Sequence, residues 1–295
     1  ILNFKAEPYW NVFAVVDDFE YKHPTDIFDK KVLERFDSIK EGIAETKETE
    51  EKIIPPCPFD LTTLQREAYR LHRIGPSQVL AIAQKLYLGG LISYPRTSSQ
   101  KIPFTIQPKK ILKDLERHFP SAKNAKRDKP IEGKKSDPAH PSIYPTGEYS
   151  DLKENDEKLY ELIVKRFISV FSDDAVTANK RVVITAKDKE NIKFTASGLH
   201  IKEKGWTIVY PAVLEERDVP TLNGKVKIDE IKIVEKETQP PKRYTPTSLV
   251  STLEKKNLGT KATRSSIVDT LFDRGYLDGR SIQATPLGMK LIETL

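Results

Sequence analysis

The stretch that decides how this chain is organised is Gly89-Gly90-Leu91-Ile92-Ser93-Tyr94-Pro95-Arg96-Thr97-Ser98-Ser99. Before it, apolar side chains recur at helical spacing from Pro76 to Leu88, which predicts a helix capped by Ser77 and ended by the two glycines. Proline disfavours α geometry in the preceding residue, so we expect Tyr94 in an extended or turn conformation. A guanidinium at Arg96 would favour the phenolate and stabilise charge on phosphoryl oxygens. Two interpretations of Tyr94 stay open: a nucleophile, or a half-buried core residue with its hydroxyl at the surface.

The composition limits the class of protein. The 295 residues suffice for two or three domains, and the net charge of +6 favours a polyanionic partner over a membrane. No apolar run approaches a membrane-spanning length and no signal peptide leads the chain, so we expect a cytoplasmic protein. The single cysteine, Cys57, excludes an internal disulfide and a multi-cysteine zinc site. The chain opens at Ile1 and its only methionine is Met289, so we expect an excised fragment, with a mature product as the alternative.

Strand-forming residues dominate two separate parts of the chain. Residues 1–18 read as one or two antiparallel strands, and a period of two predicts strands over 181–185, 192–196, 207–210 and 226–234. Between them, apolar spacing predicts a helix within 30–52, whose charged end, 45–52, would be a solvated face or loop. Ser197-Gly198 and Lys204-Gly205 are predicted turns. We infer one β domain interrupted by a helical insertion.

The insertion begins after the boundary Pro55-Pro56-Cys57-Pro58. We expect a first helix capped by Thr62, with Gln65 answering from its first turn, and further helices over 104–119 and 155–171. The lysine-rich stretch 123–135 is predicted to be a basic loop, and a phosphate contact is the alternative.

Two polar stretches are candidate binding elements. Ala139-His140-Pro141-Ser142-Ile143-Tyr144-Pro145-Thr146-Gly147 is a proline-stiffened loop, in which His140 is either a structural hydrogen-bonding residue or a phosphate ligand. Gly259-Thr260-Lys261-Ala262-Thr263-Arg264 precedes a helix over 265–274 within a helix-turn-helix-like region. Two interpretations of this stretch stay open: a helix cap without further function, and a phosphate-binding loop to which Lys261 and Arg264 add positive charge.

Four stretches of the chain form a recognisable set: LYLGGLISYPRTSSQKIP, the Leu-Gln-x-Glu-Ala run at 64–68, HPSIYPT and the stretch 259–264. Together they resemble type IA DNA topoisomerases, closest to the archaeal topoisomerase I/III branch. The resemblance implies that Tyr94 forms a 5′-phosphotyrosyl bond to a cleaved single strand, with Arg96 as the second catalytic residue. It places His140 and Thr146 on the DNA backbone, and implies further DNA contacts at Thr97, Ser98, Lys261, Thr263 and Arg264. Many relatives carry aspartate where this chain has Ser98, which leaves open the role of an acid there.

The resemblance also implies an α+β multidomain fold. A β-rich, arch-shaped domain (1–57 and 176–238) would be interrupted by a helical tyrosine-bearing domain (58–175) and followed by part of a helical DNA-groove domain (239–295). The implied activity of the full-length enzyme is ATP-independent relaxation of negatively supercoiled DNA, with single-stranded or negatively supercoiled DNA as partner, no membrane, and a monomeric state.

The family binds Mg²⁺ through an N-terminal domain that we expect to be missing here. Asp17-Asp18 follows a strand, but lacks the Asp-x-Asp spacing sought for such a site, so we predict no metal ligands in this chain and no activity of the chain alone. Two other functions stay open: the topoisomerase module of a reverse gyrase, and a non-catalytic single-stranded nucleic-acid-binding module in which Tyr94 stacks on a base.

Overall fold

The chain forms two compact units, which a computed structural model describes for residues 1, 3–187 and 191–295. The first unit comprises Ile1–Ile53, Val176–Glu203 and Val213–Lys242. The second comprises Ile54–Ala175, Lys204–Ala212 and Arg243–Leu295. The chain therefore leaves the first unit, builds most of the second, and returns. The mixed α/β class is confirmed, whereas the division into three domains stays a prediction.

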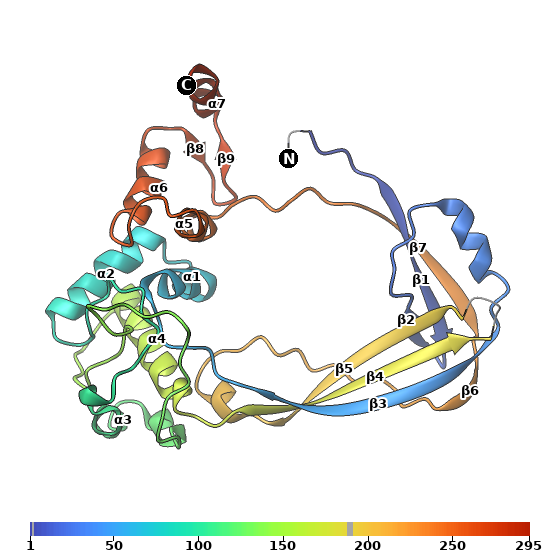
Figure 1. The fold of residues 1–295 in the computed structure, drawn as a ribbon, viewed down its shortest axis with the longest axis horizontal. Coiled ribbons are helices and arrows are strands. Elements are labelled where there is room, and N and C mark those ends of the chain that lie inside the picture. The colour runs from blue at the N-terminus through green and yellow to red at the C-terminus, as the bar shows by residue number, and fades with distance from the viewer. Residues whose placement is uncertain (2, 188–190) are drawn as a thin grey trace. The chain divides into compact units, whose positions relative to one another are not determined.

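The first unit is built on a seven-stranded sheet in the order β6-β3-β4-β5-β2-β1-β7. Its strands are β1 (Pro8–Val16), β2 (Phe19–Lys22), β3 (Glu41–Ile53), β4 (Ala175–Ala186), β5 (Lys193–Glu203), β6 (Gly224–Lys227) and β7 (Glu230–Glu237). The pairs β1–β2, β1–β7, β2–β5, β3–β6 and β4–β5 all run antiparallel. Figure 1 shows β3, β4 and β5 as long, curved neighbours.

Alternation of side chains places the core of this unit on one face of the sheet. Along β1, Val12, Ala14 and Val16 are buried, and the 3₁₀ helix η1 (Lys30–Phe36) adds Leu33 and Phe36 to the same core. This is the pattern of an antiparallel sheet with one covered face.

Three predictions of helix, turn and strand were wrong. Residues 41–53 form strand β3 rather than the end of a helix, because their backbone pairs with β4 and β6 while their side chains stay largely exposed. Ser197-Gly198 lies inside β5 instead of making a turn. Residues predicted as a strand over 207–210 begin in the 3₁₀ helix η4 (Gly205–Ile208), which belongs to the second unit.

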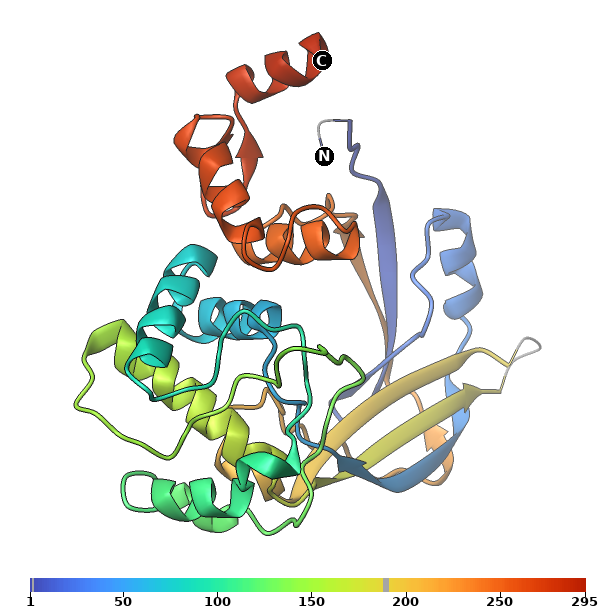
Figure 2. The same ribbon diagram turned by 60° about the vertical axis from the view of Figure 1, so that its left-hand side comes forward.

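The second unit is mainly helical (Figure 2). Its elements are α1 (Leu61–His72), α2 (Pro76–Leu88), η2 (Phe104–Ile106), α3 (Pro108–Leu115), η3 (Pro120–Asn124), α4 (Glu154–Val170), η4, α5 (Pro246–Lys255), α6 (Arg264–Asp273), the short pair β8 (Leu277–Asp278) and β9 (Gln283–Ala284), and α7 (Pro286–Thr294). The predicted helix over 155–171 is confirmed as α4, whereas the one over 104–119 is split into η2 and α3.

The helix caps differ from those predicted. Asp60, not Thr62, caps α1: its carboxylate accepts from Thr63 N at 2.7 Å, and the Thr63 hydroxyl accepts in return from Asp60 N at 3.0 Å. Gly75 caps α2 without a side-chain hydrogen bond, and Pro76 occupies the first helical position where no N–H is needed. A one- or two-residue shift of a cap leaves the helix itself unchanged.

Candidate active site

The loop that carries Tyr94 follows the end of α2. The Gly89 and Gly90 N–H groups donate to the carbonyls of Lys85 and Tyr87, and Gly90 adopts a φ of 74°, a conformation that glycine accommodates without strain. The helix therefore ends where the two glycines predicted, and Tyr94 lies in irregular backbone just beyond it.

Backbone hydrogen bonds join this loop to the His140–Thr146 loop. Ser93 N donates to Tyr144 O at 2.9 Å, and Thr146 N donates to Leu91 O at 3.0 Å. The Ser93 hydroxyl adds a bond to Ser142 O at 3.0 Å. The two motifs singled out in the sequence are thus brought together by the fold, although 49 positions separate Ser93 from Ser142.

Tyr94 is flanked by two rings. Its ring centroid lies 4.6 Å from that of His140 and 5.3 Å from that of Tyr87, which approaches edge-on. Tyr94 is partly exposed, and no hydrogen bond within the described part of the chain engages its hydroxyl. The phenol is therefore open to solvent on one side rather than sealed in a core.

Arg96 is half-buried. Its Nε is buried without a hydrogen-bond partner among the described residues. Leaving such a donor unpaired costs about 1–3 kcal/mol.

The remaining polar candidates already have partners within the protein. Thr97 is buried; its hydroxyl donates to His140 O at 3.3 Å and accepts from Ser99 N at 3.0 Å. Thr146 donates its hydroxyl proton to Gly90 O at 2.7 Å. A DNA contact by either residue would have to use a lone pair or break these bonds, and their predicted role stays a prediction.

The 259–264 loop precedes α6, as predicted, but its polar groups turn inward. Arg264 Nε donates to Leu258 O at 3.0 Å and its Nη2 to Gly259 O at 3.3 Å. The Thr263 hydroxyl accepts from Thr260 N at 2.9 Å, and as the residue at the N-terminus of α6 it makes no side-chain cap. Lys261 reaches out of the loop and pairs with Asp137.

Asp137 is a residue that sequence reasoning missed. Its carboxylate accepts from Ser98 Oγ at 3.2 Å, so an acid does stand beside position 98, supplied by another part of the chain. The sequence also showed no sign of the ion pairs of Lys135. Its ammonium lies 3.3 Å from Asp60 Oδ2 and 2.8 Å from Glu254 Oε1. The only sequence signal was the closeness of Asp137 to the His140 motif.

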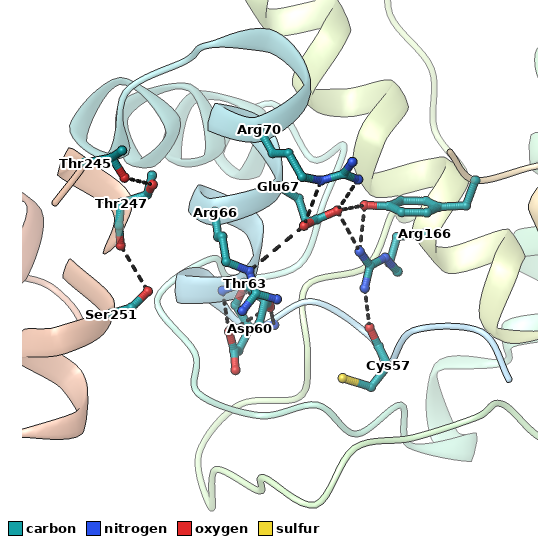
Figure 3. A network of polar contacts seen from close by, with 11 residues as sticks. Cys57, Asp60, Thr63, Arg66, Glu67, Arg70, Arg166, Thr245, Thr247 and Ser251 are labelled. Carbon is teal, nitrogen blue, oxygen red and sulfur yellow. Dashed lines mark hydrogen bonds and ion pairs between the residues drawn. The ribbon is translucent and has the colours of Figure 1, made fainter. Parts of the chain in front are cut away.

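A buried arginine, Arg166, contacts residues from three different segments of this unit (Figure 3). The Arg166 guanidinium lies 4.1 Å from the Phe59 ring centroid and 4.2 Å from that of Tyr210. Its Nη1 donates to Cys57 O at 2.9 Å and its Nη2 to the Tyr210 hydroxyl at 2.6 Å, while Glu67 lies 3.6 Å away. Burial raises the pKa of Tyr210 to about 12. Burial opposes ionisation of Glu67 as well, but hydrogen bonds from Arg70 and Tyr210 hold the pKa of this carboxyl below its usual value.

The residues that the structure describes contain neither a metal site nor a membrane-spanning helix. Across residues 1, 3–187 and 191–295, no three histidine, cysteine, aspartate or glutamate side chains converge as metal ligands. No helix in the described part of the chain has the length and apolar character to cross a bilayer.

This chain resembles known proteins over its whole length. The family model described as DNA topoisomerase matches residues 1–295. The chain is 40 % identical over 318 residues to DNA topoisomerase 1 of Pyrococcus horikoshii, covering all of this chain and 46 % of that protein. It is 41 % identical over 316 residues to DNA topoisomerase 1 of Methanocaldococcus jannaschii, covering all of this chain and 41 % of the relative.

A solved structure is also similar. Full-length topoisomerase I from Thermotoga maritima superposes with a TM-score of 0.78 at 28 % identity, covering all of this chain and 52 % of that one. The chain therefore belongs to the type IA DNA topoisomerase family, and the resemblance to its archaeal members is confirmed. It spans about half the length, or less, of the relatives it matches.

Proposed function

We propose that the full-length protein cleaves and rejoins single-stranded DNA through a 5′-phosphotyrosyl bond at Tyr94 and so relaxes negatively supercoiled DNA without ATP. The observation that carries this proposal is the partly exposed Tyr94 phenol, which lacks an intramolecular hydrogen bond within the described residues and has an unsatisfied Arg96 two positions away. The proposal rests as well on membership of the type IA family.

The reaction consists of two transesterifications. The Tyr94 oxygen attacks a backbone phosphorus and gives up its proton, the bond to the 3′ oxygen of the preceding nucleotide breaks, and that oxygen takes up a proton and leaves as a hydroxyl. The freed 3′ hydroxyl later attacks the phosphotyrosyl phosphorus and releases the phenol. One phosphoester replaces another at each step, so no nucleotide hydrolysis is required.

Arg96 supplies the electrostatic part of this reaction in the proposal. Phenols ionise in water only at a pH of about 10, so attack at neutral pH needs positive charge or a base nearby. A guanidinium whose Nε has no other partner in the described structure can bind the phosphoryl oxygens as negative charge builds on them. The His140 ring beside Tyr94 is placed to donate to the neighbouring backbone phosphate when it is protonated.

Mg²⁺ enters the proposal only as a requirement of the full-length enzyme. The described residues offer no convergent ligand set, so we assign the ion to no residue of this chain and no step runs through it.

The test is a covalent trap with full-length protein and a single-stranded oligonucleotide labelled at its 3′ end. Denaturation should leave label on the protein, because the 5′ phosphate of the labelled fragment is bonded to tyrosine. Tyr94→Phe should abolish this band and leave single-strand binding within about twofold. A band that persists in Tyr94→Phe would assign the nucleophile elsewhere, and its absence from wild type would favour a binding module in which Tyr94 stacks on a base.

A further inference from the structure

Asp137 is the point at which three separate segments meet. Its Oδ2 accepts from Ser98 N at 3.4 Å and from Ser98 Oγ at 3.2 Å, and it pairs with Lys261 Nζ. Its Oδ1 accepts from Ala139 N at 3.0 Å. The Asp137 side chain is only 6 % exposed. One carboxylate therefore joins the tyrosine loop, the His140 loop and the connection between α5 and α6.

Contacts from both the tyrosine loop and the His140 loop connect Asp137 with Tyr94. Ser98 is four residues beyond Tyr94, and the neighbouring Thr97 hydroxyl donates to His140 O. The His140 ring in turn contacts the Tyr94 ring. Two hydrogen bonds, from Ser98 and from Thr97, and one ring contact therefore connect Asp137 with Tyr94.

Lys261 keeps capacity for a second anion. An ammonium carries three donors, and Asp137 Oδ2 uses one of them. The lysine side chain remains 37 % exposed, and Asp137 is the one partner of its ammonium among the described residues. Without Asp137, a lysine on a flexible four-carbon stem has no fixed position.

The surroundings of the Asp137 carboxyl favour its ionised form. The hydrogen bond from Lys261 holds the pKa of Asp137 well below its usual range, and the N–H groups of Ala139 and Ser98 act in the same direction against burial. The ion pair is therefore a constant feature of the site near neutral pH.

We propose that Asp137 is a positioning residue for strand cleavage: it holds Lys261 against the tyrosine loop, so that the ammonium binds a backbone phosphate of the strand that Tyr94 attacks. This inference rests on the proposed function. It assigns to Asp137 an effect on the rate of the chemical step rather than on DNA affinity, because removing the carboxylate leaves the charge of Lys261 in place but not its orientation.

A second ion pair keeps the segment in place when Asp137 is changed. Lys135, two residues away, bridges Asp60 and Glu254 independently of Asp137. Asparagine at position 137 keeps one carbonyl oxygen, which can accept from Ala139 N or from Ser98 but not from both, since these donors reach different oxygens of Asp137. The variant Asp137→Asn is therefore expected to fold.

The experiment measures the single-turnover rate of covalent-complex formation with the 3′-labelled oligonucleotide, in full-length protein. Asp137→Asn should lower this rate at least tenfold, while the Kd for the oligonucleotide stays the same or falls, since one negative charge is lost. Lys261→Met should lower the rate as much and reduce the salt dependence of binding by about 0.7 in log–log slope, as for one lost single-strand phosphate contact. The double variant should be no slower than the slower single one, and Lys261→Arg should recover at least a third of the wild-type rate.

Asp128→Asn is the matched control. Asp128 makes an exposed ion pair with Lys109 at 2.6 Å, so this variant changes the net charge equally and should leave the rate unchanged. A rate for Asp137→Asn equal to that of Asp128→Asn would overturn the inference. A faster rate would do so too, because it would mean that the carboxylate blocks a phosphate site.

Two further measurements keep the outcomes separate. Melting temperatures show whether Asp137→Asn is folded; if it is not, Lys261→Met decides alone, and an unchanged rate in that variant overturns the inference. A normal rate in Asp137→Asn with no band in Tyr94→Phe would reject the positioning role only. A band in Tyr94→Phe would reject the proposed function.

Discussion

Replacing Arg166 with methionine should destabilise the helical unit strongly. The Arg166 side chain is 6 % exposed, donates to Cys57 O and the Tyr210 hydroxyl, and lies between two rings. Methionine has similar length and keeps part of the packing, but it removes both hydrogen bonds and the positive charge beside Glu67. Because these groups come from the chain entering the unit, from α1 and from the returning segment, one side chain holds all three on α4.

The magnitude follows from these contacts. A hydrogen bond that involves a charged group contributes about 1.5–3 kcal/mol, and removing one partner of a buried ion pair costs about 3–5 kcal/mol in all. Glu67 retains its bond from Arg70 at 2.8 Å, which argues against a larger figure. We therefore expect a loss of about 3–5 kcal/mol, or a fall in melting temperature of roughly 6–20 °C for a unit of this size.

The assay is thermal unfolding followed by circular dichroism, with Lys165→Met as the control. Lys165 is the neighbour of Arg166 on α4 and pairs with Glu161 at 2.7 Å at the surface, where such pairs contribute only about 0.3–0.5 kcal/mol. Arg166→Lys should also cost more than the control, because an ammonium cannot reproduce the planar fork. If Arg166→Met melts within 2 °C of Lys165→Met (roughly the effect of 0.5–1 kcal/mol), the network does not hold the unit together and the reasoning is wrong.

Three more predictions concern stability. Gly42→Ala should destabilise the sheet by about 1–3 kcal/mol in denaturant unfolding, because a Cβ there would lie 2.8 Å from the Thr185 carbonyl oxygen, whereas Gly75→Ser, with nothing within 4 Å, should be near neutral. Asp60→Ala should cost about 1–3 kcal/mol, since it removes the α1 cap and the acceptor for Gln100 and Lys135; a melting temperature equal to wild type would contradict this. Burial raises the pKa values of Tyr160 and Tyr210 to about 12, so in an absorbance titration two of the eleven tyrosines should ionise last. The unfolded chain loses these protons near pH ~10, so stability should fall as the pH rises from there towards 12; an unchanged unfolding free energy over that window would refute the assignment.

Local sequence signals were sufficient for the tyrosine loop and several helices. Gly89-Gly90 ends α2 and Pro95 keeps Tyr94 out of the helix, because both act through the backbone of adjacent residues. The apolar stripe of α4 likewise predicted its span, since a helix is bonded within its own segment. The family was also recognisable from these short stretches.

Strand β3 shows where local signals fail. Its charged run, Glu45–Lys52, has no buried face of its own to reveal a period of two, and it is a strand only because β4 pairs with it. Local signals also failed for residues 207–210, which were predicted as a strand. Tyr210 instead accepts a hydrogen bond from Arg166 through its hydroxyl.

The sequence by itself determined which functional groups are available: the phenol of Tyr94 past a helix end, the guanidinium of Arg96 two positions on, and the basic residues Lys261 and Arg264 at the start of α6. Only the tertiary structure decided which of these groups meet. Lys261 pairs with an aspartate 124 positions away, and Arg166 with a tyrosine 44 positions away. Such pairings depend on how remote segments pack, and neither side chain carries a local periodicity or turn preference that names its partner.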